Sequence, residues 1–263
     1  MRRIVDCHCH VYPDKVAARA VAGIGSFYNM PLLMDGTLSM LKKEGEAAGI
    51  THYIVFSVAT KPAQTKSINE FIAGIVAGSD GCMTGLGTLH PESEDIAGDI
   101  AHLEELGLKG VKLHPDIQGF SVEDERCLDI FRRCEGRLPV LLHTGDYRYD
   151  FSNPDRICRI LERFPGLTVI GAHLGGWSVW QEAAEKLSGH ANFYVDCSSS
   201  LYALTPDQAR EIVRMYGADR VLFGTDYPMW SPAGELNRLD QLGLTEAEMD
   251  RILWDNAAGL FGL

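Results

Sequence analysis

Two histidines near the start of the chain have a spacing that suits metal binding. His8 and His10 end a predicted strand, Arg3–His10, and in a strand residues i and i+2 project to the same side. Their imidazoles can therefore reach one cation from a rigid element. The pair alone is weak evidence, because core packing explains most sequences of this kind.

Three further side chains of the same chemical type end apolar runs elsewhere. His143 ends Pro-Val-Leu-Leu-His, His173 ends Thr-Val-Ile-Gly-Ala-His, and Asp226 ends Val-Leu-Phe-Gly-Thr-Asp. Imidazole and carboxylate suit a divalent ion, zinc first, with manganese or iron(II) as alternatives. We expect one such ion, held by four ligands: His8, His10, His143 and Asp226. Its bound water would have a pKa of about 7, with His173 as the general base and Asp226 sharing that role.

The elements that must position these residues recur with a regular period. Apolar, β-branched runs alternate with segments of helical periodicity, and after the first interval the runs start about 25 to 32 residues apart, the length of a βα unit. This pattern predicts parallel strands joined by helices. The eight predicted strands are Arg3–His10, Thr51–Val58, Cys82–His90, Lys109–His114, Leu138–Thr144, Leu167–His173, Asn192–Ser198 and Arg220–Asp226.

Eight βα units in 263 residues fit a closed (β/α)8 barrel, with residues 1–263 as one domain. The alternative, an open doubly wound sheet, usually carries a glycine-rich loop after its first strand, where this chain has His-Cys-His. The histidines and Asp226 all fall at carboxyl ends of predicted strands, the face on which barrels carry active sites. On that face we predict a long aromatic loop from Val11 to Gly36, which is either a lid or substrate wall or an ordinary packed surface loop.

Charge and cysteine content narrow the partners. The formal net charge is −12 at pH 7 without any basic cluster, so we expect neither nucleic acid nor a membrane surface as a partner. The seven cysteines lack a CxxC pair, and the N-terminus lacks the apolar core of a secretory signal. These features favour a cytoplasmic protein with reduced thiols that acts on a small molecule. A homodimer is compatible with them.

The motifs together resemble the amidohydrolase superfamily, and more narrowly its amidohydrolase-related group of TIM-barrel metal-dependent hydrolases. The resemblance covers the whole chain and implies the ligands and the strand-six histidine named above. It rests on Asp-x-His-x-His at 6–10, GVKLHP at 110–115, LHTGD at 142–146, AHLGGW at 172–177, FGTDYP at 223–228 and the closing segment 255–261.

The fourth predicted strand leaves an alternative open. Lys112 and His114 have the same parity and are both expected to point inward. Two-metal members of the superfamily carry a carboxylated lysine on this strand, so a second metal on a carboxylated Lys112 is the less favoured alternative. We expect Lys112 to be an interior cation paired with an acid such as Asp6, and His114 to contact substrate.

Residues that follow other strands are weaker candidates for the substrate mouth. Lys61 and His90 follow strands two and three, Arg148 follows the strand-five ligand, and Trp177 follows His173. Cationic side chains there would suit a carboxylate or another anionic group. The competing interpretation for each cation is a solvated loop charge.

We expect hydrolysis of an amide, lactone or similar bond first. The alternative is metal-dependent, non-oxidative decarboxylation of a small aromatic or unsaturated acid, since the resembling group also contains decarboxylases. The compact chain lacks room for the long insertions of those decarboxylases, which favours the hydrolase. A catalytically silent barrel is the third interpretation, and the complete ligand set argues against it.

Overall fold

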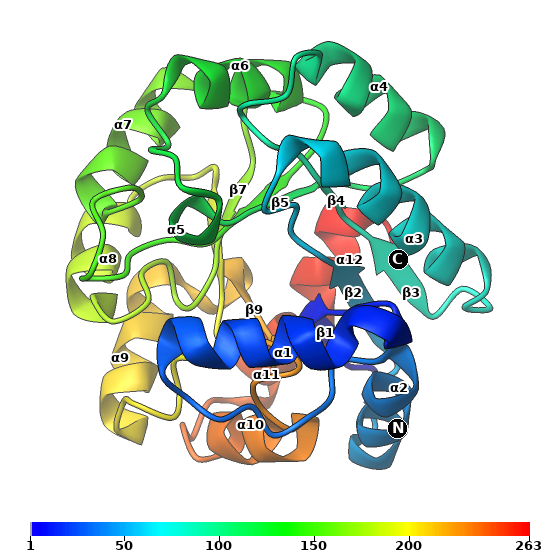
Figure 1. Cartoon of the computed structure of the whole chain (residues 1–263). Helices are drawn as coiled ribbons and strands as arrows, with labels where there is room; N and C mark the ends of the chain where they lie inside the picture. The colour runs from blue at the N-terminus through cyan, green and yellow to red at the C-terminus, as the bar shows by residue number, and fades with distance from the viewer. Residues whose placement is uncertain (1) are drawn as a thin grey trace.

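The strands pair only in parallel, as the alternation of strands and helices predicts. The structure, a computed structural model, describes residues 2–263 (Figure 1). Hydrogen-bonded neighbours run in the order β1-β2-β3 and β4-β5-β6-β7-β8-β9. The strands are β1 (Val5–His10), β2 (His52–Phe56), β3 (Met83–Gly85), β4 (Gly87–Thr88), β5 (Val111–Leu113), β6 (Val140–Leu142), β7 (Val169–Gly171), β8 (Phe193–Asp196) and β9 (Val221–Leu222).

Backbone hydrogen bonds join these two runs into a barrel. Leu86, which separates β3 from β4, donates its N–H to Val55 O at 3.0 Å, so the third predicted strand is present in two pieces. Cys7 N donates to Phe223 O at 2.9 Å and thereby links the first strand to the last. The predicted (β/α)8 barrel with eight strand positions is confirmed.

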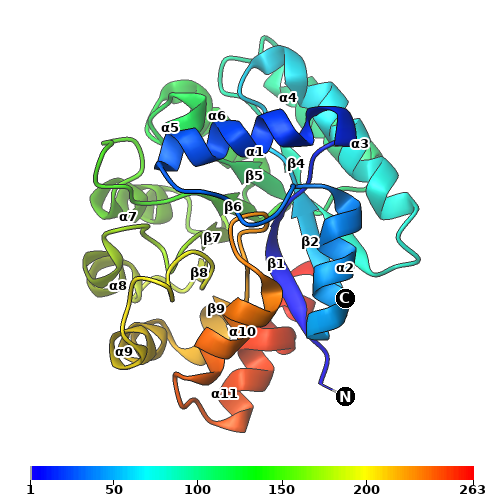
Figure 2. The ribbon, with the colours of Figure 1, turned by 60° about the horizontal axis from the view of Figure 1, so that its bottom comes forward.

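Helices surround the strands (Figure 2). Several begin where the sequence places a cap. The hydroxyls of Thr205 and Thr245 each accept a hydrogen bond from the third helical N–H, and their own backbone N–H groups donate in return to the side chain of that third residue, which completes a capping box. The helices are α1 (Asp14–Tyr28), α2 (Leu38–Ala48), α3 (Thr65–Ala77), α4 (Ile96–Glu105), α5 (Pro115–Gln118), α6 (Glu125–Cys134), α7 (Pro154–Arg163), α8 (Trp180–Leu187), α9 (Pro206–Tyr216), α10 (Pro232–Asp240), α11 (Glu246–Asp250) and α12 (Asn256–Phe261). The short 3-10 turns η1 (Pro62–Gln64) and η2 (Ala218–Arg220) and the π-helical turn η3 (Arg251–Asp255) complete the elements.

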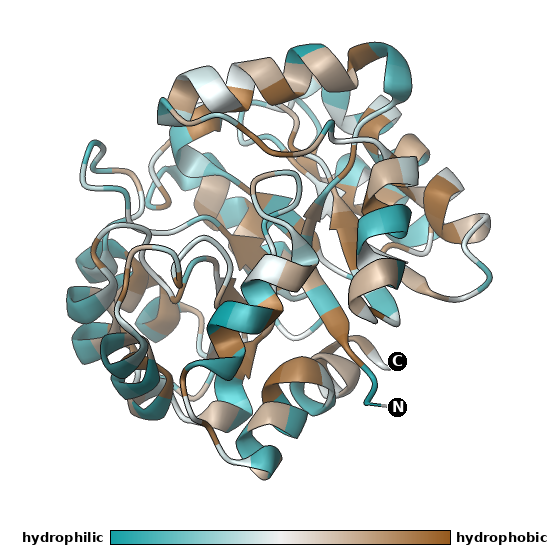
Figure 3. Cartoon of the chain, turned by 90° about the horizontal axis from the view of Figure 1, so that it is seen from below, coloured by the Kyte–Doolittle hydropathy of each residue, from teal (hydrophilic) through white to brown (hydrophobic). Residues whose placement is uncertain are grey.

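The core lies between the strands and the inner faces of the helices. Figure 3 shows the strands at the centre as largely hydrophobic and the outer helices as mixed. On α7, Ile157, Ile160 and Leu161 are buried, which is the face that the sequence periodicity predicts. Among the described residues, no helix is long and apolar enough to cross a membrane.

The segment from Val11 to Gly36 differs from the prediction, because it contains helix α1 rather than a continuous loop. Pro13 precedes the helix and Asn29 ends it in the left-handed conformation, at φ 52°. In Figures 1 and 2, α1 crosses one end of the barrel. The aromatic residues Phe27 and Tyr28 therefore come from the last turn of a helix and are placed more firmly than loop residues would be.

A close approach of α2 to β2 depends on Gly45. A Cβ atom at this position would lie 2.1 Å from Oη of the buried Tyr53. We predict that Gly45→Ala lowers the free energy of unfolding by about 1–3 kcal/mol through overpacking, measured by urea denaturation. The matched control is Gly74→Ala on α3, where a Cβ meets nothing within 4 Å. Gly74→Ala should raise the free energy of unfolding by up to about 1 kcal/mol. Equal changes in the two variants would contradict the packing argument.

The buried Glu235 on α10 makes stability depend on pH. Its Oε1 is paired with Arg238, and its Oε2 has no hydrogen-bond partner among residues 2–263. Burial raises its pKa from 4.5 to about 7. The folded protein therefore binds the proton of the Glu235 carboxyl more strongly than the unfolded protein does. The resulting contribution to the free energy of unfolding is complete below pH 4.5 and is lost as pH rises through about 7.

We predict that Glu235→Gln removes this loss. The difference in free energy of unfolding between the variant and the unsubstituted protein should shift in favour of the variant by up to about 3 kcal/mol from pH 5 to pH 8. Urea denaturation at pH 5 and at pH 8 measures it. Glu211→Gln, at an exposed position on α9, is the control and should show no such gain. A pH-independent difference for Glu235→Gln would rule the explanation out.

Candidate metal centre

Three side chains from opposite ends of the sequence converge at the end of β1. His8 Nε2 lies 3.3 Å from His10 Nε2 and 3.3 Å from Asp226 Oδ1. His10 Nε2 lies 3.5 Å from the same carboxylate oxygen. His8 is fully buried, and His10 and Asp226 are each 9% exposed. These three atoms can face one cation, as the spacing of the two histidines predicts.

Backbone pairing across the first and last strand positions holds this convergence. Tyr227 N donates to His8 O at 3.1 Å, and His10 N donates to Tyr227 O at 2.8 Å. Asp226 lies between these contacts at a φ of 55°, and Ser199 Oγ donates to its Oδ2 at 2.5 Å. Burial acts to raise the pKa of Asp226, but the neighbouring His8 and His10 outweigh it and hold the pKa below its usual range. The carboxylate is therefore ionised.

Asp196, which our sequence analysis missed, orients His8. His8 Nδ1 donates to Asp196 Oδ2 at 2.9 Å, and both side chains are fully buried. This bond leaves Nε2 of His8 as the nitrogen with the free lone pair, the arrangement common to metal-ligating histidines. Burial and the nearby Lys112 lower the pKa of His8 to about 4, so the ring is neutral at pH 7. Asp196 ends β8, so the rule that selected Asp226 could have selected it too.

The donor set fits a divalent cation. Two neutral imidazoles and one ionised carboxylate meet within 4.8 Å, and such ligands bind zinc, manganese or iron. The convergence of these three donors and their chemistry are therefore those of a cation-binding site.

His143, the fourth expected ligand, lies beside this group but not within it. Its Nδ1 is 3.1 Å from His173 Nε2, and its Nε2 is 3.4 Å from Asp116 Oδ2. Its ring stacks on His114, with centroids 3.9 Å apart. The potential ligand atoms of His143 cluster with those of His114 and Asp116 instead. A role for His143 in holding the cation stays a prediction.

His173, the expected proton acceptor, is fixed by its backbone neighbour. Its Nδ1 donates to Ser198 O at 3.0 Å, which leaves Nε2 as the nitrogen that can exchange a proton. The ring stacks on that of His8 with centroids 5.0 Å apart. His173 therefore adjoins the convergent group, as its place at the end of the sixth predicted strand suggests.

Lys112 is an interior cation, as predicted, but it is not paired with Asp6. Its Nζ lies 3.4 Å from His8 Nε2 and 5.3 Å from the centre of the Phe56 ring. Asp6 instead accepts hydrogen bonds from Thr225, 3.0 Å from N and 2.6 Å from Oγ1. Burial lowers the pKa of Lys112 to about 8. A second metal on a carboxylated Lys112 stays the less favoured alternative.

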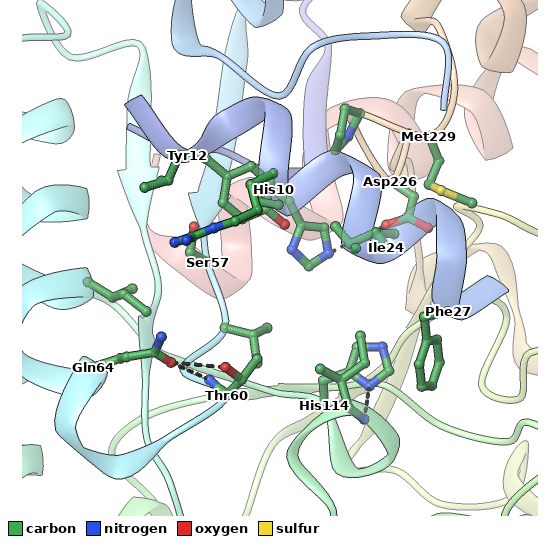
Figure 4. Close-up of a pocket in the computed structure, with 18 of the residues that line it drawn as sticks. His10, Tyr12, Ile24, Phe27, Ser57, Thr60, Gln64, His114, Asp226 and Met229 are labelled. Carbon is green, nitrogen blue, oxygen red and sulfur yellow. Dashed lines mark hydrogen bonds and ion pairs between the residues drawn. The ribbon is translucent and has the colours of Figure 1, made fainter. Parts of the chain in front are cut away.

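A cavity of about 560 Å³ opens beside these residues and is lined in part by α1. Figure 4 shows His10, Asp226, Phe27 and His114 around one part of it and Gln64 toward the other. His143 and His173 also line it. His114 Nε2 is 2.9 Å from the hydroxyl of Tyr28, an α1 residue that our sequence analysis did not assign to the site.

The other residues predicted for the substrate mouth lie outside the cavity lining. Lys61 is exposed before η1, and His90 is buried with its Nδ1 accepting from Glu92 N. Arg148 pairs with Asp146 and donates to Phe27 O at 2.7 Å, while its guanidinium lies 5.4 Å from the Trp177 ring centre. Arg148 thus secures α1, and contact of these four residues with substrate stays a prediction.

The bond between Asp196 and His8 gives a direct test of the centre. We predict that Asp196→Asn weakens Mn²⁺ binding about 10- to 100-fold, because the amide no longer fixes the tautomer or basicity of His8. Titration calorimetry would measure this on protein shown by circular dichroism to be folded. Asp219→Asn, at an exposed position before β9, is the matched control. Equal affinities of the two variants would contradict the orienting role.

Comparison with known proteins agrees with this architecture. A solved structure of an uncharacterized TIM-barrel protein, Bb4693 from Bordetella bronchiseptica, superposes with a TM-score of 0.80 at 24% identity, covering 99% of this chain and 98% of that one. A dihydroxybenzoic acid decarboxylase from Polaromonas sp. JS666 was solved with bound manganese and the inhibitor 2-nitroresorcinol. It superposes with a TM-score of 0.75 at 17% identity, covering 100% of this chain and 98% of that one.

Similarity in sequence extends to a curated relative and to a family. Gamma-resorcylate decarboxylase from Polaromonas sp. (strain JS666 / ATCC BAA-500) is 27% identical over an alignment of 123 residues, and the match covers 40% of this chain and 37% of the relative's length. The family model described as amidohydrolase matches residues 5–263, nearly the whole chain. With its barrel and its strand-end histidines, this protein belongs to the amidohydrolase family.

Proposed function

We propose that the protein is a metal-dependent, non-oxidative decarboxylase of a small carboxylic acid. The observation that carries the proposal is the convergence of His8, His10 and Asp226 beside a cavity with apolar walls. The similarity to decarboxylases supports this alternative better than the hydrolase that we expected first.

His8, His10 and Asp226 would hold the cation. When bound, a divalent ion would attract the substrate carboxylate and spread its negative charge. The related decarboxylase structure with manganese makes Mn²⁺ the first ion to test, with Zn²⁺, our expectation from the sequence, second. Asp196 and Ser199 keep His8 and Asp226 in place, through bonds of 2.9 and 2.5 Å.

The walls of the cavity would favour loss of the carboxylate. Ile24 and Phe27 of α1 line it, and apolar surroundings disfavour a charged group relative to water. In the proposed step the bond between the carboxylate carbon and its neighbour breaks and CO2 leaves. The electron pair stays on the substrate carbon, which then takes up a proton.

His173 is the proposed source of that proton. It lines the cavity, and Ser198 O holds its Nδ1–H, so the exchangeable proton is on Nε2. His114 and Tyr28, 2.9 Å apart, would contact the substrate on the α1 side. The cytoplasmic location and the homodimer that are compatible with the sequence stay predictions.

Release of CO2 from γ-resorcylate tests the proposal, with an o-hydroxy aromatic acid panel as a second step. We predict Mn²⁺-dependent release that is abolished by chelation and restored by Mn²⁺.

Because His173 would supply the proton, His173→Asn should lower kcat about 10²- to 10⁴-fold without changing metal content. Chelator-insensitive release would contradict the metal-dependent step. Hydrolysis of a lactone or amide panel without CO2 release would return the assignment to the hydrolase.

A further inference from the structure

The inner face of α1 is apolar but incompletely covered. Val16, Ala20, Ile24 and Phe27 recur at helical spacing, so they share one face of the helix. All four line the cavity and are only half-buried. A helix normally packs such a face against protein, whereas here it borders a space of about 560 Å³.

The opposite wall is of the same kind. Ile68 and Phe71 of α3, with Val58 after β2 and Ile117 of α5, line the cavity and are also half-buried. Apolar surface that lines a concave site is characteristic of ligand pockets, and pockets of about 300–1,000 Å³ hold ligands larger than a single ring. The walls therefore suit an apolar body between α1 and α3.

A cation lies along α1 from the histidines. Arg19 is the one lysine or arginine among the described residues that line the cavity. It is exposed, and within the described part of the chain it forms no ion pair, unlike Arg148. Eight residues separate Arg19 from Phe27, about 12 Å along the helix, and the Phe27 ring centre is 6.3 Å from that of His114.

We propose that the substrate is an elongated dicarboxylic acid with an apolar body. One carboxylate would face His10 and Asp226 and be lost as CO2. The body would lie between α1 and α3, and the second carboxylate would pair with Arg19. This substrate class rests on the proposed decarboxylase function and adds the feature that recognises the end of the molecule that does not react.

Titration calorimetry of the Mn²⁺-loaded protein with succinate, adipate and suberate tests the apolar body. Affinity should rise with chain length, by up to about fourfold for each methylene that enters the cavity. Ile24→Asn should reduce this dependence, while Ala22→Asn, on the exposed side of α1, should not. Equal affinities for succinate and suberate would overturn the proposal.

Arg19→Gln tests the second carboxylate. Suberate binding should weaken about two- to fivefold, as expected for loss of an ion pair at an exposed side chain, while octanoate binding stays unchanged. Lys15→Gln, exposed on the same helix and outside the cavity lining, is the matched control and should bind both probes as before. Indistinguishable behaviour of the two variants would overturn the assignment of Arg19.

These measurements separate the two proposals. Arg19- and length-dependent binding of suberate without CO2 release from any acid would keep the pocket assignment and refute the decarboxylase. Release of CO2 from γ-resorcylate, with binding of the dicarboxylates that depends neither on Arg19 nor on chain length, would support the decarboxylase and refute the pocket assignment.

Discussion

The pairing of the first strand with the segment after the last is the constraint on which the site depends. His8 and Asp226 are separated by most of the chain, yet Tyr227 exchanges backbone hydrogen bonds with His8 and His10. Those bonds bring Nε2 of both histidines within 3.5 Å of Asp226 Oδ1. An open sheet would leave these strands at opposite edges, so closure of the barrel and assembly of the centre are the same event.

Gathering so many polar groups in a buried space needs a surrounding set of hydrogen bonds. Asp196 fixes the tautomer of His8, Thr225 satisfies Asp6, and Ser198 O fixes His173. Without such partners each buried group would cost about 1–3 kcal/mol. The same bonds leave Nε2 of His8 facing His10 and Nε2 of His173 facing His143, so both nitrogens point into the group of site histidines.

Helix α1 supplies what the barrel lacks. Strand ends provide polar groups, whereas an apolar wall needs an element that covers the mouth. Arg148 joins α1 to the loop after β6, because its guanidinium pairs with Asp146 and donates to Phe27 O. In the proposed function, substrate selection would depend on a helix that is outside the repeating βα pattern, while the chemistry would depend on residues within it.

The sequence by itself determined the eight strand positions and the group of His8, His10 and Asp226. Both follow from local rules: apolar runs form buried strands, and parallel strands present their last residues on one face. The caps at Thr205 and Thr245 were equally predictable, because a capping box involves residues only three positions apart.

Only the tertiary structure decided which partner each side chain takes. Lys112 lies by His8 rather than Asp6, and Arg148 is occupied by Asp146. His143 stacks on His114 instead of joining the convergent group. The helical face of α1 has meaning only against the cavity below it, so the sequence pattern did not reveal it. Such contacts join residues far apart in the chain, and their distances are set by packing rather than by spacing along the sequence.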